Sequence, residues 1–356
     1  MASVRFEHAS IDVGGTRVLT DVSLDVADGD FLGVIGPSGS GKSTLLRAVA
    51  GFADVVVGRL TIDGEDMAGV RVARRDVGMV LQQPVLFPHR SVERNVAFPL
   101  ELRHQAREEI RRRVGAEVRA MHVEHLLGRR PSSLSRGEAQ LVQIARTMVR
   151  TPRVLLLDEP LANLDDALRR RVRAELRMLQ EGYAVTTLVA TNDPEDAMHL
   201  PQRLAVLHDG RVVQVGSAAE VSRAPATLDA AVATGECSLL PVTVVADRDG
   251  FWLERVGRGG SFRHRVWAPA LKPWAGTEVT LMIRPDDVIV SATGSIDARA
   301  VRRVPGQPST LICEVAGRNV GLHDHDADVQ PGDPLRLRLD HAVVFDPAAG
   351  TAIAST

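Results

Sequence analysis

The sequence predicts an α/β domain built on a parallel sheet, followed by a smaller all-β domain. Up to about residue 236, short apolar segments alternate with segments of helical periodicity, which is typical of a parallel sheet covered by helices on both faces. After about Cys237, short strand candidates separated by Gly, Pro and Asp follow one another without helical periodicity, which favours a small barrel or sandwich. Residues 1–236 and 237–356 are therefore the expected domains.

Composition and charge narrow the class of protein. The chain has 356 residues, 44% of them hydrophobic, which is enough for two packed cores. The 43 basic and 45 acidic residues nearly cancel, so nothing in the charge favours nucleic-acid binding. Cys237 and Cys313 are the only cysteines, which indicates a reducing compartment. No signal-peptide core is found, and no apolar run approaches the ~20 residues of a membrane span. We therefore expect a cytoplasmic protein that reaches membranes through partners.

The first third of the chain predicts strands around one helix. Three apolar or alternating segments, SVRFEHASIDV, RVLTDVSLDV and DFLGVIG, are separated by GG and DGD turns. A helix is expected from Lys42 to Gly51, and short strands are expected near Leu60 and at Val77–Leu81.

Helical periodicity dominates the middle third. Ile110, Val114, Val118 and Met121 recur at i, i+4, i+8 and i+11, which places them on one helix face. Two further helix faces are formed by Leu141, Ile144 and Met148 and by Leu168, Val172, Leu176 and Leu179. Two fully apolar strands, Val154–Leu157 and Val185–Ala190, alternate with these helices.

A phosphate-binding loop lies between a strand and a helix. GPSGSGKS, residues 36–43, fits G-x-x-x-x-G-K-[ST] in full, and this pattern is more specific than a glycine-rich turn. The glycines let backbone N–H groups close on phosphate oxygens, and the helix N-terminus adds positive potential. Lys42 is expected to reach the β- and γ-phosphates, and Ser43 to ligate Mg²⁺. The expected nucleotide contacts are Gly36, Pro37, Ser38, Gly39, Ser40, Gly41, Lys42, Ser43 and Thr44.

Two acidic residues end the apolar strand VLLLDEP. Alone, Asp158 and Glu159 could equally be a polar strand end. Together with the loop at residue 36, they predict the second half of a nucleotide site. Asp158 is expected to hold the magnesium ion through water, and Glu159 to orient or deprotonate the attacking water.

Two neighbouring segments carry a family resemblance. LSRGEAQLVQIARTM (134–148) stands shortly before VLLLDEPLANLDDAL (154–168), and this order resembles the nucleotide-binding subunits of ATP-binding-cassette transporters. The resemblance covers residues 3 to about 230. It implies an α/β P-loop NTPase core with an inserted helical subdomain at about 88–150. The strands around Leu281–Val290 are similar to the OB-like, TOBE-type β-domain of the importer subgroup, which serves sugars, polyamines, sulfate and ferric iron.

The resemblance also implies roles for residues outside the loop. Gln82 stands at the family's glutamine, which reaches magnesium and the attacking water. Ser135, Gly137 and Glu138 belong to the signature that faces the γ-phosphate on a second subunit, and Asp165 lies in the dimer-contact loop. Ser135 and Glu138 also form an S-x-x-E pattern, which predicts a capping box on the following helix.

The same resemblance implies cofactors and partners. Two subunits, identical or different, are expected to sandwich two ATP molecules with Mg²⁺, because each signature completes the other subunit's site. Pro84–His89 is expected to help dock a transmembrane permease, so that the chain lies at the cytoplasmic face of the membrane. A solute-binding protein takes part indirectly, and no nucleic acid is expected. Similarity to the maltose-type branch favours a carbohydrate as the solute.

Several positions depart from the family pattern. Asn192 stands where the family has its switch histidine; an amide can donate a hydrogen bond but cannot carry a proton near neutral pH. Either Asn192 or Asp193 is expected to cap the next helix. Arg136 replaces the first signature glycine, Glu138 replaces the glutamine, and Val13 stands where an aromatic stacks on adenine. We therefore expect slowed or asymmetric ATP hydrolysis.

Two other interpretations stay open: a non-transport ATPase of the same fold, and a mainly regulatory subunit whose β-domain binds a signalling protein or small molecule. The HDHD segment at 323–326 is expected to be a solvated loop rather than a metal site. Trp252, Trp267 and Trp274 are expected in a core or interface.

Overall fold

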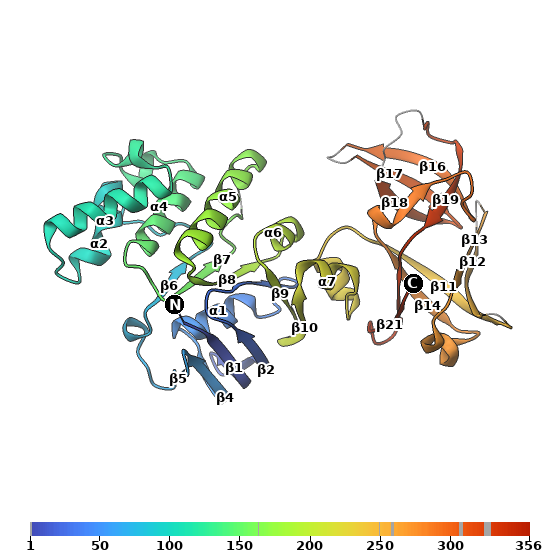
Figure 1. Cartoon of the computed structure of the whole chain (residues 1–356), viewed down its shortest axis with the longest axis horizontal. Coiled ribbons are helices and arrows are strands. Elements are labelled where there is room, and N and C mark those ends of the chain that lie inside the picture. Colours follow the sequence, from blue (N-terminus) through green and yellow to red (C-terminus); the bar gives the residue numbers. More distant parts are fainter. Residues whose placement is uncertain (1, 163, 249, 258–259, 306–308, 324–328) are drawn as a thin grey trace. The chain divides into compact units, whose positions relative to one another are not determined.

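The protein is described by a computed structural model that covers residues 2–162, 164–248, 250–257, 260–305, 309–323 and 329–356 (Figure 1). The chain divides into two compact units, Met1–Ala218 and Ala219–Thr356. The division precedes the boundary expected at residue 237, because the intervening helices are bonded to the β-strand unit. The Leu228 N–H donates to Gly350 O at 2.9 Å, and the Arg284 guanidinium donates to Ser222 O at 3.0 Å.

The first unit is organised around a six-stranded sheet. Its order is β10-β9-β3-β8-β7-β6, with β10 antiparallel to β9 and the other neighbours parallel. The bounds are β3 Phe31–Ile35, β6 Val77–Val80, β7 Val154–Asp158, β8 Thr186–Thr191, β9 Arg203–His208 and β10 Arg211–Ser217. The predicted parallel sheet is confirmed, and the carboxyl ends of β3, β8 and β7 meet at one edge.

The remaining N-terminal strands form a sheet of their own. They pair antiparallel in the order β2-β1-β4-β5, with bounds β1 Val4–Val13, β2 Thr16–Val26, β4 Asp54–Ile62 and β5 Glu65–Asp66. The sequence predicted β1, β2 and β4 but not β5, and it did not predict that these strands form a sheet separate from the central one, because tertiary packing selects the pairing partners.

Helices cover both faces of the central sheet. Side chains of β7 alternate between two cores: Leu156 belongs to the core with α1, while Leu155 and Leu157 belong to the core with α2–α5. Figure 1 shows α2, α3 and α4 together, in the segment for which the sequence predicts an inserted helical subdomain. The bounds are α1 Lys42–Ala50, α2 Val92–Glu101, α3 Arg107–Ala120, α4 Arg136–Met148, α5 Asp166–Tyr183 and α6 Pro194–His199.

The second unit consists of two antiparallel sheets over one core, preceded by two short helices. The sheet orders are β13-β12-β11-β14-β20-β21 and β15-β19-β16-β17-β18. The bounds are α7 Ala218–Arg223, α8 Leu228–Ala233, β11 Ser238–Asp247, β12 Gly250–Gly257, β13 Gly260–Val266, β14 Glu278–Ile283, β15 Val288–Val290, β16 Ile296–Val304, β17 Thr310–Val315, β18 Arg318–His323, β19 Pro334–Leu339, β20 Val343–Phe345 and β21 Ala352–Ser355. The expected all-β C-terminal domain is confirmed.

Among the described residues, no helix combines the length and the apolar character that a bilayer crossing requires. Of the HDHD segment, only His323 lies in the described part, where its Nδ1 is 2.5 Å from Asp286 Oδ1; residues 324–326 lie outside it.

Candidate nucleotide-binding site

The loop at residues 36–41 is a backbone cradle between β3 and α1. Gly36 has a φ of 150°, and a Cβ at this position would lie 2.0 Å from the Leu207 carbonyl oxygen, so only glycine fits. The first helical bond runs from Leu45 N–H to Gly41 O. The N–H groups of Lys42, Ser43 and Thr44 therefore have no partner within the helix, and they form the positive end of its dipole.

Lys42 lies across this cradle. Its side chain is buried, and Nζ donates to Gly36 O at 2.8 Å and to Pro37 O at 2.9 Å. Burial lowers the pKa of Lys42, while the carboxylates of Glu159 and Asp158 oppose that shift. A buried ammonium held by carbonyls alone is under-neutralised, so an anion placed in the loop would gain a strong partner.

Ser43 and Asp158 meet at the edge of the sheet. The Ser43 hydroxyl donates to Asp158 Oδ1 at 2.8 Å. A hydroxyl and a carboxylate at this separation, both hard oxygen donors, fit the ligand preference of Mg²⁺, which usually takes one or two protein ligands and completes its shell with phosphates and water. The donor set therefore fits the expected metal.

Glu159 follows in a conformation with positive φ, 44°, which is uncommon for a non-glycine residue. Its N–H donates to Ala190 O at 2.9 Å, which fixes the backbone against β8. The Gln82 side-chain amide donates to Glu159 Oε2 at 2.7 Å. The carboxylate is thus held by a residue that follows β6, the strand that pairs in parallel with β7.

Gln82, Glu159 and Asn192 line one cavity of about 260 Å³. The Asn192 side chain is exposed and does not cap α6; Asp193 does, accepting from the N–H groups of Glu195 and Asp196. Of the two caps left open by the sequence, Asp193 is therefore the correct one. This leaves the Asn192 amide available on the cavity wall.

Arg169 is a cavity residue that the sequence did not indicate. It lies on α5, lines the same cavity, and pairs with Asp193. Its Nε is buried without a hydrogen-bond acceptor. Its position one turn after Asp165, on a helix facing the cavity, is the only local signal that could have pointed to it.

Comparison with known proteins identifies the family. Residues 19–162 match the family described as ABC transporter. Over 99% of this chain and 100% of the other protein, the sequence is 35% identical to YurJ of Bacillus subtilis, described as an uncharacterized ABC transporter ATP-binding protein. The chain belongs to the family of ABC transporter ATP-binding proteins. The predicted family, fold class and ATPase character are confirmed.

Other relatives of this ABC ATP-binding protein are import subunits. It is 33% identical to the sn-glycerol-3-phosphate import protein UgpC of Ruegeria, over 99% of this chain and 100% of that one. It is 39% identical to the maltose/maltodextrin import protein MalK of Salmonella typhimurium, over 82% and 79%. Among solved structures, cbiO1 of Clostridium perfringens matches with TM-score 0.57 and 28% identity, covering 60% of this chain and 88% of that one. A dimeric ATP-binding cassette bound to ADP and Pi matches with TM-score 0.55 and 28% identity, covering 60% and 98%.

The signature segment of this ABC protein begins α4 with the predicted capping box. Ser135 Oγ accepts from Glu138 N–H at 3.2 Å, and the Glu138 carboxylate accepts from Ser135 N–H at 2.7 Å. The latter bond is the main reason that the pKa of Glu138 is lowered. Arg136 is exposed and lines a separate cavity of about 480 Å³ with Gln82 and Gln140.

The expected nucleotide contacts fall into two groups that do not meet within the described chain. No hydrogen bond among the described residues joins 135–138 to 36–44. Asp165 caps α5 by accepting from Leu168 N–H at 3.0 Å and is exposed. Gly137 faces Leu168, whose Cδ2 would lie 2.1 Å from an added Cβ. The loop and the two acidic residues form one cluster, and the signature with Asp165 forms another.

Proposed function

We propose that this ABC ATP-binding subunit hydrolyses ATP in a nucleotide-sandwich dimer and drives solute import through membrane-spanning permease subunits. The observation that carries the proposal is the line of contacts along one sheet edge, from Ser43 to Asp158 and from Glu159 to Gln82. It supplies a phosphate cradle, a magnesium-type donor set and an oriented carboxylate next to one cavity. Similarity along the chain to importer subunits supports the direction of transport.

Nucleotide binding rests on the loop. The amides at the start of α1 and the glycine-rich backbone bind the phosphates. Lys42 exchanges its bonds to Gly36 O and Pro37 O for phosphate oxygens, which relieves the cost of its burial. Val13, 44% exposed, offers a small apolar contact to the base instead of an aromatic face, so adenine is held less firmly.

Metal binding rests on three oxygen donors. Ser43 Oγ would ligate Mg²⁺, Asp158 would hold it through water, and the Gln82 side chain would contribute to the same site. When bound, the ion neutralises charge on the phosphates. The Ser43–Asp158 hydrogen bond at 2.8 Å is the contact that the ion would replace.

The residues that line the cavity catalyse the hydrolysis of ATP. Glu159 orients and deprotonates the attacking water, and the Gln82 amide holds the carboxylate in place. The Asn192 amide donates toward the γ-phosphate but carries no charge, so turnover is slower than with histidine; a lost transition-state donor typically costs about 10²–10³ in rate. Arg136 at the signature adds bulk where backbones approach closely.

A second subunit completes the site. The signature and the dimer-contact residue lie apart from the loop of their own chain: Ser135, Gly137, Glu138 and Asp165. They act on the nucleotide of the partner subunit, which is a copy of this chain or a related one.

The permease docks near Gln82 and residues 84–89, which places the subunit at the cytoplasmic face of the membrane. The solute is a carbohydrate, by similarity to the maltose/maltodextrin import proteins; relatives described as spermidine/putrescine import proteins make a polyamine the alternative.

Subunit mixing tests the proposal. Lys42→Ala removes the loop's cation but keeps the signature, whereas Ser135→Arg blocks the signature but keeps the loop. Each variant alone is expected to lose ATP turnover. A mixture of the two recovers part of it, because the mixed dimer contains one intact composite site. Ser132→Arg, an exposed serine of the same segment, is the matched control and keeps activity. No recovery in a mixture that forms dimers would contradict the two-subunit site.

Co-purification from membranes distinguishes a transport function from the two other interpretations, a non-transport ATPase and a regulatory subunit. The tagged full chain is expected to co-purify with multi-spanning membrane proteins from detergent extracts. Recovery with RNA, DNA or ribosomes instead would favour the non-transport ATPase. Turnover that is equal in the native chain and in Glu159→Gln would favour the regulatory interpretation.

A further inference from the structure

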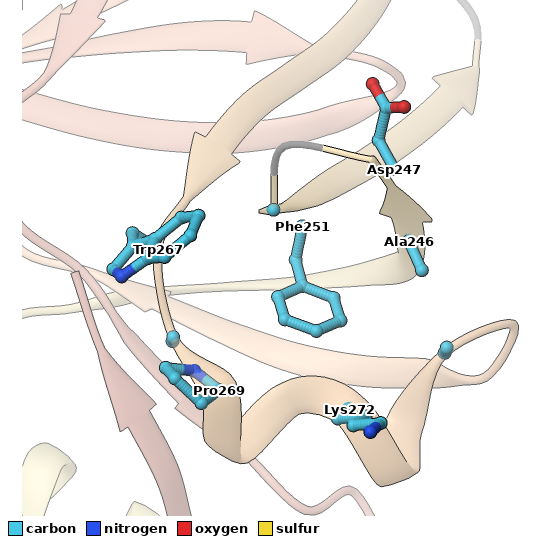
Figure 2. A pocket seen from close by; sticks show the side chains of 9 residues that line it. Ala246, Asp247, Phe251, Trp267, Pro269 and Lys272 are labelled. Carbon is cyan, nitrogen blue, oxygen red and sulfur yellow. The ribbon is translucent and has the colours of Figure 1, made fainter.

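The β-strand unit contains an apolar cavity that the ATPase function does not use. Figure 2 shows it between the β11–β12 hairpin and the segment after β13, with the Phe251 ring between Trp267 and Lys272. Its volume is about 580 Å³. This lies within the ~300–1,000 Å³ range of small-molecule sites. The lining residues are Ala246, Asp247, Gly250, Phe251, Trp267, Ala268, Pro269, Lys272 and Ala275.

Trp267 is exposed and yet held in place. The residue is 80% exposed, so of the two places expected for it, a core or an interface, the core is excluded. An added Cβ on Gly250 would lie 3.3 Å from Trp267 Cε3, so the indole packs against the glycine backbone. Because Phe251 pairs with Val266 across the sheet, Phe251 and Trp267 are brought to the same edge. A positioned indole with an open face is a stacking surface for a flat ring.

The floor of the cavity is the 3₁₀ segment Pro269–Trp274, which is anchored by the fully buried Leu271. Gly276 N–H donates to Val244 O at 2.7 Å and closes this segment onto β11. The cavity walls are therefore fixed by sheet pairing and a buried anchor, so the site is largely preformed.

Lys272 supplies an unpaired positive charge at the rim of this cavity. Within the described residues its ammonium has no hydrogen-bond or ion-pair partner, and the residue is exposed. The chain has only two lysines among its 43 basic residues, Lys42 and Lys272. Asp247 is already engaged: its carboxylate accepts from Arg248 N–H at 2.6 Å and from Trp252 Nε1 at 3.4 Å. Figure 2 shows this carboxylate directed away from the Phe251 ring.

We propose that this cavity binds a small, flat organic acid: the ring stacks on Trp267 and Phe251, and the anionic group pairs with Lys272. Apolar walls exclude a fully hydrophilic anion, and the volume suits one or two fused rings. A cationic ligand is disfavoured because the ammonium of Lys272 has no partner in the described part of the chain, whereas the Asp247 carboxylate accepts hydrogen bonds within its own hairpin and points away from the Phe251 ring. The cavity lies in the β-strand unit and shares no lining residue with the proposed ATP site.

Binding of naphthalene-1-sulfonate to the full chain tests the proposal by calorimetry. The anion is expected to bind, and 1-naphthylmethylammonium, with the same ring system and the opposite charge, is expected to bind at least tenfold more weakly. Trp267→Ala and Lys272→Gln each weaken anion binding about tenfold, while Trp267→Phe retains most of it. Val256→Ala and Arg302→Gln, at exposed positions outside the cavity, are matched controls and leave binding unchanged.

Amine labelling gives a second readout. Since Lys42 is buried, Lys272 is the accessible lysine, and its acetylation is read from one peptide by mass spectrometry. The naphthalene anion is expected to slow this labelling severalfold, and MgATP is expected not to. The proposal is overturned if the anion fails to bind at millimolar concentration, if the cation binds as well, or if the two cavity variants bind like the native chain while melting at the same temperature.

Discussion

The Gln82 side-chain amide donates a 2.7 Å hydrogen bond to Glu159 Oε2 and so links two residues that are 77 positions apart. Gln82 follows β6 and Glu159 follows β7, and these strands pair in parallel. A carboxylate held by a donor in this way has a defined orientation toward the cavity that Asn192 also lines. The contact thus joins a residue just before the expected permease-docking segment to the carboxylate that we propose to be hydrolytic.

Replacing Glu159 by glutamine tests the role of this carboxylate. Glu159→Gln keeps the size and a hydrogen-bonding oxygen but removes the base, so steady-state ATP turnover should fall about 10²–10⁴-fold. Nucleotide binding, measured by calorimetry with Mg²⁺, should persist because the loop at 36–43 is unchanged. Glu181→Gln, on an exposed position of α5, is the control and should keep full turnover. Undiminished hydrolysis by Glu159→Gln would remove Glu159 from the mechanism.

Restoring a histidine at residue 192 should accelerate the reaction. Asn192→His places a group that can carry a charge on the cavity wall beside Glu159, and turnover is expected to rise tenfold or more. The gain should be larger at pH 6 than at pH 8, because the imidazole is mostly protonated only below its usual pKa of about 6.5. Asn319→His, at an exposed position of β18, should change nothing. Equal turnover of Asn192→His and the native chain would show that Asn192 does not limit the rate.

The capping box on α4 predicts that substitutions of its two residues differ in their effect on the free energy of unfolding. Ser135→Ala removes the acceptor for Glu138 N–H and should cost about 1 kcal/mol of unfolding free energy. Glu138→Gln keeps the reciprocal bond to Ser135 N–H, because glutamine also completes this motif, and should be nearly neutral. Ser132→Ala is the exposed control. Urea unfolding at pH 7.5 measures all three, and a destabilised Glu138→Gln would show that the carboxylate charge matters.

The buried carboxyl group of Glu117 on α3 predicts that the stability of the folded chain depends on pH. Glu117 is 4% exposed, and burial raises its pKa from the ordinary 4.5, although the Tyr183 hydroxyl donates to its Oε1 at 2.7 Å. The folded chain therefore keeps a proton that the unfolded chain releases. This contribution is complete below about pH 4.5 and is lost as the pH rises through the folded-state pKa.

Glu117→Gln removes the cost of burying an ionised carboxylate above the folded-state pKa, and it keeps an acceptor for the Tyr183 hydroxyl. At pH 7.5 the variant should be more stable than the native chain by about 1 kcal/mol, and the difference should shrink as the pH is lowered toward 4.5. Tyr183→Phe, which leaves the carboxyl without its donor, should lower stability at pH 7.5. Melting curves across this range check both, and a difference independent of pH would contradict the raised pKa.

The parts of the site that are contiguous in the chain could be predicted from it. The loop at 36–43, the acidic pair after β7 and the S-x-x-E box each depend on neighbouring residues whose backbone geometry is local, so spacing was sufficient. The choice of Asp193 over Asn192 as helix cap was not predictable, because both residue types cap well and the decision depends on the ion pair between Asp193 and Arg169 on another helix.

Residues that act through distant packing left weaker signals. Arg169 lines the cavity from α5, and its position one turn after Asp165 is the only local signal of that placement. Trp267 was expected in a core or an interface; the structure excludes the core, because the residue lies at the surface, where its indole packs against Gly250. The division between the units moved to Ala218 because backbone bonds tie α8 to the end of the chain.

The sequence by itself determined the class of fold, the phosphate loop, the acidic pair and the family, because each is encoded in hydrophobic period or in residues adjacent along the chain. Only the tertiary structure decided which of these groups share a cavity, that signature and loop stay apart within one chain, and that a rigid apolar cavity with a free ammonium exists in the β-strand unit. The reason is physical: strand order and side-chain packing bring together residues far apart in sequence, and no local pattern specifies those neighbours.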